Sequence, residues 1–154
     1  MKTIIYNADI ANEGCLTRGY IVIDDEIIAE VGEGTPPAAV MAECDVRNDV
    51  DGALVMPGVI DDQVHFRDPG LTHKADIATE SAAAVAGGVT SYMDMPNTVP
   101  PTVTIDALEA KNRRAQEVSV ANYGFFIGAT IDNLKTLMAV DYSYTPGVKL
   151  VLGA

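Results

Sequence analysis

Four polar side chains alternate with apolar ones where a hydrophobic segment of the sequence ends. The four are Asp61, Gln63, His65 and Arg67, and Val64 and Phe66 lie among them. Side chains of a β-strand point alternately to its two faces, so the sequence predicts one polar face and one packing face. A carboxylate, a histidine and an arginine on one face can hold a metal ion and bind an anionic substrate. The alternative interpretation is an edge strand with ordinary surface polar residues.

Two further polar residues interrupt or follow apolar segments later in the chain. Asn97 follows the segment 89–95, and Lys149 lies within the segment 148–152. Each residue has a local alternative, because an asparagine readily forms a turn and a strand-end lysine can reach solvent. His73 precedes the first expected helix, and we interpret it as a loop residue or a contact at the helix start.

The elements that would position these residues alternate between strand and helix from residue 59 onward. We expect strands at 59–66, 89–95, 120–128 and 148–152, and helices at 76–86, 105–117 and 133–140. Thr104 is placed to cap the second helix, and the pair Gly87 and Gly88 is placed to end the first. This order predicts a parallel sheet with right-handed crossovers, and the polar residues would lie at the carboxyl ends of its strands.

The first part of the chain has a different pattern, with short strands and turns up to Met56. We expect strands at 3–8, 20–24, 27–31 and 53–56, with a loop at 32–37. This pattern predicts a small antiparallel β unit. The sequence therefore indicates two domains, at 1–56 and 57–154.

Composition limits the classes of partner. The chain has 154 residues, of which 48% are hydrophobic, and a net charge of -12. This acidity argues against nucleic acids and anionic membranes as partners, because both attract basic proteins. The N-terminal apolar run is too short for a signal peptide or a membrane span, so we expect a cytoplasmic protein. Cys15 and Cys44 have no neighbouring metal-ligating residues, and we interpret both as reduced packing residues.

Several motifs in this order resemble those of dihydroorotases in the amidohydrolase superfamily. They are Met56-Pro57-Gly58-Val59-Ile60-Asp61, His65-Phe66-Arg67-Asp68-Pro69-Gly70, Ala86-Gly87-Gly88-Val89-Thr90, Asp94-Met95-Pro96-Asn97-Thr98 and Pro146-Gly147-Val148-Lys149-Leu150. The resemblance covers essentially the whole chain. Allantoinases are similar in overall plan but usually lack this arginine and the Asn-Thr pair.

The resemblance implies an α/β fold, with part of a small β-sandwich followed by about four strands of a TIM barrel. It implies the reversible cyclisation of N-carbamoyl-L-aspartate to L-dihydroorotate in pyrimidine biosynthesis. The implied cofactor is zinc, up to two ions in the complete protein, which polarises the scissile amide. The implied partner is a small-molecule substrate.

The resemblance also implies roles for individual residues. His65 matches a zinc-ligating histidine next to the substrate, and Arg67 and Asn97 match residues that hold the substrate carboxylate. Lys149 matches a lysine that many members carboxylate to bridge two metals. Gln63 stands where members have another histidine, and an amide oxygen is a weaker zinc ligand than imidazole.

The family's remaining ligands and its general base would lie after Ala154, so we expect an inactive N-terminal half with no catalytic base of its own. An open half-barrel has unpaired strand edges, so we expect association into homo-oligomers. Because of Gln63, a second hypothesis stays open, in which the chain is a fragment of a non-catalytic dihydroorotase-like partner of aspartate transcarbamoylase. A third reading is a self-standing small α/β binding domain.

Overall fold

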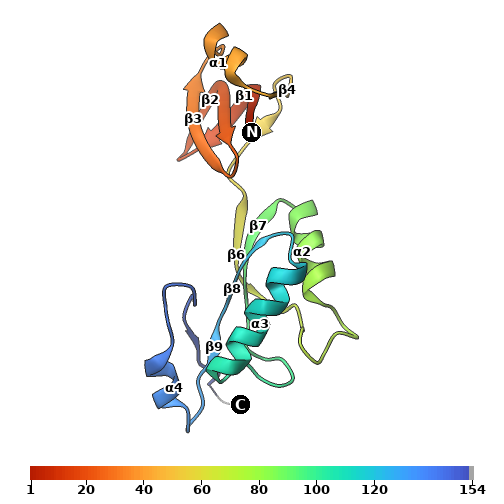
Figure 1. The fold of residues 1–154 in the computed structure, drawn as a ribbon, viewed down its shortest axis with the longest axis vertical. Helices are drawn as coiled ribbons and strands as arrows, with labels where there is room; N and C mark the ends of the chain where they lie inside the picture. The colour runs from red at the N-terminus through yellow and green to blue at the C-terminus, as the bar shows by residue number, and fades with distance from the viewer. Residues whose placement is uncertain (153–154) are drawn as a thin grey trace. The chain divides into compact units, whose positions relative to one another are not determined.

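A computed structural model describes residues 1–152 of the chain (Figure 1). The chain divides into two compact units, Met1–Pro57 and Gly58–Ala154. No helix among residues 1–152 combines the length and apolar character needed to cross a membrane.

The first unit is a five-stranded sheet with one short helix. Its elements are β1 (Lys2–Asn12), β2 (Cys15–Asp24), β3 (Ile27–Glu33), α1 (Ala38–Glu43), β4 (Val46–Asp49) and β5 (Leu54–Val55). The sheet order is β3-β2-β1-β4, and β5 also pairs with β1. The two hairpins are antiparallel, whereas β4 and β5 pair with β1 in parallel. The prediction of a purely antiparallel unit was therefore wrong, and α1 was not predicted.

A β-bulge divides the apolar side chains of β1 between the two faces of this sheet. The pairing of β1 with β2 shifts between Ile5 and Ala8, and Asn7 in this gap has a left-handed φ of 56°. A bulge inserts an extra residue, so the side chains beyond it change faces. Ile4 consequently packs with the α1 side chains, and Ala8 belongs to a second cluster. A strict two-residue alternation along β1 would have assigned both residues to one face.

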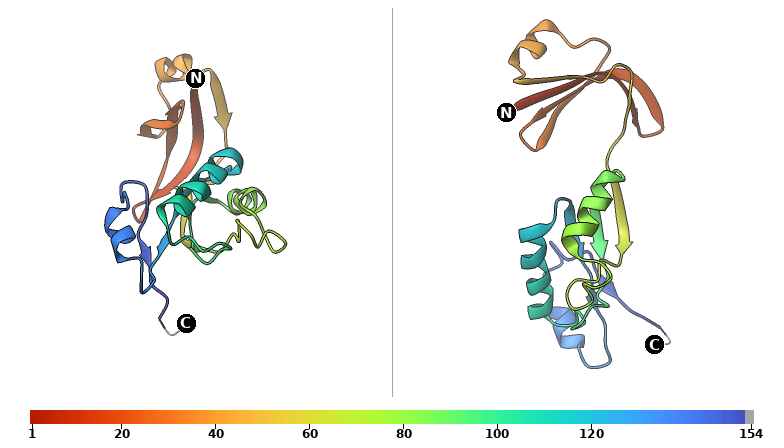
Figure 2. Two further views of the ribbon diagram at one scale, coloured as in Figure 1. Left: turned by 60° about the horizontal axis from the view of Figure 1, so that its bottom comes forward. Right: turned by 90° about the vertical axis from the view of Figure 1, so that its right-hand side faces the viewer.

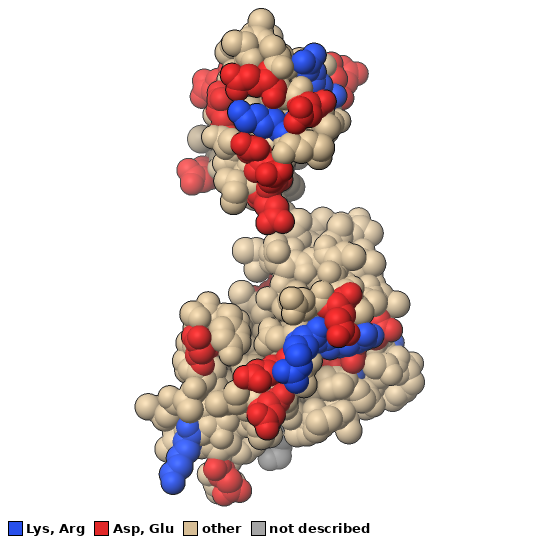
Figure 3. All heavy atoms as spheres, in the orientation of Figure 1, with Lys and Arg blue, Asp and Glu red and all other residues tan. Residues whose placement is uncertain are grey.

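Acidic side chains are concentrated in the first unit (Figure 3). Residues 1–57 contain eleven of the 22 acidic residues but only three of the ten basic ones. The polar exterior of this unit is therefore mainly carboxylate. Cys44 is buried, which confirms its interpretation as a packing residue, whereas Cys15 is exposed, so the same interpretation was wrong for Cys15.

The second unit has two small parallel sheets and three helices. Its elements are β6 (Val59–Val64), α2 (Ile77–Ala86), β7 (Val89–Asp94), α3 (Ile105–Val118), β8 (Asn122–Phe125), β9 (Ile127–Gly128), α4 (Leu134–Ala139) and β10 (Val148–Lys149). One sheet has the order β6-β7-β8, and the other pairs β9 with β10. The predicted strand at 120–128 is thus two strands in different sheets. Helices α2 and α3 lie on the same side of the sheet β6-β7-β8 (Figure 2).

Capping residues set the bounds of the two longer helices. Asp76 caps α2 by accepting a hydrogen bond from the Thr79 backbone N–H, and Thr104 accepts one from the Ala107 N–H at the start of α3. Gly88 follows α2 with a φ of 88°, a conformation that glycine adopts without strain. The predicted positions of both helices were correct to within one residue at each end.

The core of the second unit joins these helices to the sheet. Buried side chains from every layer meet in one cluster: Phe66, Ile77, Tyr92, Leu108, Ala115, Phe125, Ile127 and Val140. The face of the sheet toward the helices is therefore the packing face. The strand ends that carry polar side chains remain outside this cluster.

Candidate active site

Strand β6 ends at Val64, so the polar residues before and after this position have different backbone conformations. Gln63 is in the strand, whereas His65 and Arg67 lie in the loop that follows. Arg67 has a left-handed φ of 69°, which breaks the strand alternation. The prediction that one strand at 59–66 aligns all four polar side chains was therefore wrong. The Asp61 carboxylate accepts a hydrogen bond from the Gln63 backbone N–H, at 3.1 Å.

His65 and Asn97 are in direct contact, although 32 positions separate them in the sequence. The imidazole Nδ1 of His65 lies 2.9 Å from the amide Oδ1 of Asn97. A carboxamide oxygen only accepts hydrogen bonds, so Nδ1 carries the proton and the lone pair of the neutral ring is on Nε2. This tautomer is the one that can bind a metal or accept a proton through Nε2. Within residues 1–152 the Asn97 NH₂ group donates to no protein atom, so its donors can serve a ligand.

Gln63 and Lys149 form a second contact between distant segments. The Lys149 Nζ donates a hydrogen bond to the Gln63 Oε1 at 3.3 Å. Lys149 is half-buried at the end of β10, and Gln63 is exposed near the end of β6. The strand-end lysine therefore does not simply reach solvent. Its ammonium group contacts the Gln63 side chain instead.

The loops after β6 and β7 are bound together by their backbones. The Met95 N–H donates to the Val64 carbonyl at 3.0 Å, and the Val99 N–H donates to the Pro69 carbonyl at 3.1 Å. Gly70 has a φ of 83° and lies so close to the Val99 carbonyl that a Cβ atom would collide with it. These contacts place the loop of His65 directly beside the loop of Asn97.

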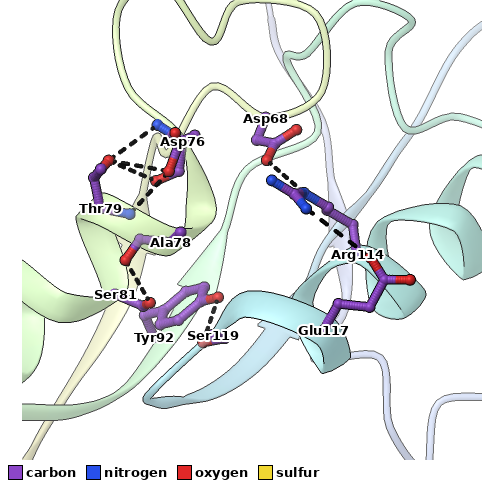
Figure 4. Close-up of polar contacts among 9 residues, drawn as sticks. All are labelled: Asp68, Asp76, Ala78, Thr79, Ser81, Tyr92, Arg114, Glu117 and Ser119. Atoms are coloured by element: carbon purple, nitrogen blue, oxygen red, sulfur yellow. Dashed lines mark hydrogen bonds and ion pairs between the residues drawn. The ribbon is translucent and has the colours of Figure 1, made fainter.

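Asp68 does not neutralise its neighbour Arg67. The buried Asp68 carboxylate instead accepts from the Arg114 Nε at 3.3 Å, and Arg114 also lies 3.9 Å from Glu117 (Figure 4). Among residues 1–152, Arg67 and Asp68 form no ion pair with each other. The half-buried Arg67 guanidinium keeps its planar set of donors for a carboxylate.

Polar contacts around α2 and α3 fix the elements behind the site (Figure 4). The Thr79 backbone N–H lowers the pKa of the Asp76 carboxyl at the start of α2. The Tyr92 hydroxyl donates to the Ser119 Oγ at 3.1 Å, and burial raises the pKa of Tyr92 to about 12. These contacts fix the start of α2 and join β7 to the residue that ends α3.

Sequence reasoning missed the buried ion pair between Asp94 and Lys111. Both side chains are almost completely buried beneath these loops. One signal was available, because Lys111 shares the buried stripe of α3 with Leu108 and Ala115. A charged residue at a position of helical core spacing needs a buried partner.

The donor set for a metal is only partial. Among residues 1–152, no three His, Cys, Asp or Glu side chains gather closely enough to hold a metal ion. His65 offers one imidazole, and Gln63 offers an amide oxygen next to Lys149. A zinc ion usually takes at least three protein ligands, so this set fits part of a zinc shell and not a whole one.

Several named proteins are similar in sequence to this chain. A family model described as dihydro-orotase-like matches residues 52–145, which include His65, Arg67 and Asn97 but not Lys149. A dihydroorotase of Methanothermobacter thermautotrophicus is 41% identical over 124 residues, which cover 78% of this chain and 27% of the relative. An allantoinase of Deinococcus radiodurans is 44% identical over 90 residues, covering 58% of this chain and 20% of the relative.

A solved structure shares the fold. The L-hydantoinase (dihydropyrimidinase) from Arthrobacter aurescens matches with a TM-score of 0.82 and 28% identity, over 98% of this chain and 34% of the hydantoinase. The chain thus spans about a third or less of the length of the relatives it matches. Since the family model matches more than half of the chain, the chain belongs to the dihydroorotase-like family.

Proposed function

We propose that this chain is the N-terminal part of a dihydroorotase, which interconverts N-carbamoyl-L-aspartate and L-dihydroorotate. The observation that carries the proposal is the convergence of strand ends in the second unit. The contact of His65 with Asn97 and the contact of Gln63 with Lys149 join segments that are far apart in sequence. Active sites of parallel α/β folds lie at the carboxyl ends of strands, where these residues are found.

We further propose that the second unit supplies about four strands of a TIM barrel and that the first unit is part of a β-sandwich. The parallel pairing in both sheets and the helices on one side of β6-β7-β8 support this view of the second unit. A TIM barrel has eight strands, so further strands from outside this chain would complete it. The likeness to the L-hydantoinase structure supports the same assignment.

The substrate carboxylate would bind between Arg67 and Asn97. A guanidinium can donate two parallel hydrogen bonds to a carboxylate, and the free Asn97 NH₂ adds a neutral donor. Because Asn97 also accepts from His65, one amide would orient both the imidazole and the substrate. The loop connections at Met95 and Val99 hold these groups at a fixed separation.

Zinc, when bound, would polarise the amide that is cleaved or formed. His65 would hold it through Nε2, and a carboxylated Lys149 and the Gln63 oxygen would lie beside it. Carboxylation of Lys149 would form a bond between its Nζ and carbon dioxide, and Lys149 lies at the end of β10 in contact with Gln63. The remaining ligands and the general base would come from outside residues 1–152.

The test is a zinc-dependent assay of both directions of the reaction. The complete gene product should interconvert the two compounds, and the 154-residue chain alone should not, because on this proposal the general base comes from another part of the protein. Turnover by the isolated chain, or no turnover by the complete protein, would contradict the proposal. Activity on allantoin instead of dihydroorotate would favour the second candidate, an allantoinase, which the Deinococcus radiodurans relative supports.

Two substitutions in the complete protein test the residue roles. Arg67→Lys keeps the charge but loses the planar fork, so kcat/KM should fall at least about tenfold while zinc content is unchanged. His65→Ala should remove zinc as well as activity. Equal zinc loss in both variants would show that the roles are wrongly assigned.

Gln63 supports a further candidate, a non-catalytic homologue that binds aspartate transcarbamoylase. In that case Gln63→His would be expected to raise the zinc content of the complete protein without creating turnover. Assembly into a homo-oligomer and a cytoplasmic location are our other proposals for the complete protein. Light scattering and cell fractionation test them.

A further inference from the structure

A carboxylate and an ammonium group are buried together beneath the candidate site. Asp94 is the last residue of β7 and is 1% exposed, and Lys111 on α3 is 2% exposed. The Lys111 Nζ lies 2.5 Å from the Asp94 Oδ2, and 4.9 Å from the centre of the Phe125 ring. Neither residue has a role in the proposed reaction. Their burial therefore calls for another explanation.

The remaining hydrogen bonds of this pair go to the two loops that carry the site. The Asp94 Oδ1 accepts from the Phe66 backbone N–H at 2.9 Å, and Phe66 lies between His65 and Arg67. The Lys111 Nζ donates to the Met95 carbonyl at 3.0 Å, two residues before Asn97. The ion pair thus connects the backbone of one loop to the backbone of the other.

Stability alone does not account for such a pair. Removing two charges from water is costly, and replacing a buried ion pair with apolar side chains is often neutral or stabilising. Burial lowers the pKa of Lys111, and the Asp94 carboxylate opposes this shift. An apolar pair would fill the same space without this cost. It would not hold the Phe66 N–H or the Met95 carbonyl.

We propose that Asp94 and Lys111 are positioning residues, which fix the loop of His65 and Arg67 relative to the loop of Asn97. The charged groups act through the two backbone hydrogen bonds and do not touch the substrate. The chemical identity of that substrate rests on the proposed function, whereas the positioning of the loops does not.

Amide hydrogen exchange of the 154-residue chain tests the proposal, read by mass spectrometry with fragmentation to single residues. The variant Asp94→Leu/Lys111→Met removes both charges and both hydrogen-bonding groups, while Leu keeps the branching of Asp and Met nearly the length of Lys. Exchange in segments 64–70 and 95–99 should become at least about tenfold faster. In the unchanged chain these segments must break the bonds to the ion pair before they open, and in the variant this cost of opening is absent. Exchange within α2 (Ile77–Ala86) should stay unchanged.

Two control variants on α3 separate positioning from general stability. Arg113→Met removes one positive charge from the exposed side of the same helix and should leave exchange unchanged. Leu108→Ala opens a cavity in the core and should speed exchange across helices and strands alike. If the double variant changes exchange in this same general way, or does not change it in the two segments, the proposal is overturned.

One measurement on the unchanged chain decides the outcome even if the double variant fails to fold. The Phe66 amide should exchange far more slowly than the amide of exposed His65, because it is bonded to Asp94. Equal exchange of the two amides would overturn the proposal. Amide exchange does not depend on turnover. The experiment therefore distinguishes failure of the positioning proposal from failure of the proposed reaction. In a complete, active protein the double variant should also lower kcat/KM, and Arg113→Met should not.

Discussion

The two units of this chain use charged side chains in opposite ways. In the first unit, the ion pairs of Arg18 with Asp9 and of Lys2 with Glu43 lie at the surface. In the second unit, Lys111 and Asp94 form their pair inside the core. Surface pairs contribute little to folding, whereas a buried pair constrains the geometry around it. The unit that carries the candidate site is therefore the one that encloses charges.

The units also differ in how their strands are connected. In the first unit, β1, β2 and β3 follow one another as antiparallel hairpins. In the second, neighbouring parallel strands are joined through helices, so their carboxyl ends lie at the same edge. The second arrangement brings side chains from the ends of successive strands together. This difference explains why the contact of His65 with Asn97 occurs in the second unit.

The largest expected difference follows from removing one charge in each unit. Lys111→Met leaves the buried Asp94 carboxylate without a partner and should lower the free energy of unfolding by about 3–5 kcal/mol. Arg18→Met breaks a pair in which both side chains are 39–50% exposed and should cost less than about 1 kcal/mol. Urea denaturation followed by circular dichroism measures both. Equal losses would mean that burial does not separate the two pairs.

A glycine in each unit sharpens the comparison of loops. Gly14 and Gly70 both have left-handed φ values, of 76° and 83°, but an added Cβ would be free at Gly14 and would collide with the Val99 carbonyl at Gly70. Gly14→Ala should cost about 1 kcal/mol from backbone strain alone, and Gly70→Ala roughly 3 kcal/mol. Thermal unfolding of the two variants gives the comparison. A smaller loss at Gly70 would argue against the close approach of the loops.

Helix capping should have a smaller effect. The Thr104 hydroxyl accepts from the Ala107 N–H at 3.2 Å, whereas α1 in the first unit begins at Pro37 without a side-chain cap. Thr104→Ala should destabilise the second unit by about 1 kcal/mol, and Thr104→Ser, which keeps the hydroxyl, should not. Chemical denaturation distinguishes them. Similar losses in both variants would show that the cap does not stabilise α3.

The smallest expected effect is on pH dependence. The hydrogen bond from the Thr79 backbone N–H is the main cause that lowers the pKa of Asp76. In the first unit, the hydrogen bond from the Asn7 side chain is the main cause that lowers the pKa of Asp49. A carboxyl pKa below its unfolded value of about 3.9 stabilises the folded state above that pH, and this contribution is lost as the pH falls through the folded pKa. Asp76→Asn and Asp49→Asn should each flatten the decline of the melting temperature below about pH 4. An unchanged slope would contradict the assignment.

Local sequence patterns determined much of this fold. The caps Asp76 and Thr104 and the glycine after α2 are short-range signals, so they predicted the bounds of both longer helices. The alternation of strands and helices after residue 59 predicted parallel pairing, which the structure confirms. The residue types at Gln63, His65, Arg67, Asn97 and Lys149 indicated a polar site before any contact was known.

Tertiary structure decided what these residues touch. The break of β6 after Val64 and the left-handed Arg67 depend on bonds to the neighbouring loop, which no local pattern encodes. Likewise, Lys111 is an ordinary helix residue by propensity, and only the tertiary packing of α3 reveals its partner Asp94. Sequence determines chemistry and local conformation because both depend on near neighbours. The partners of His65 and Lys111 depend on chain segments that only folding brings together.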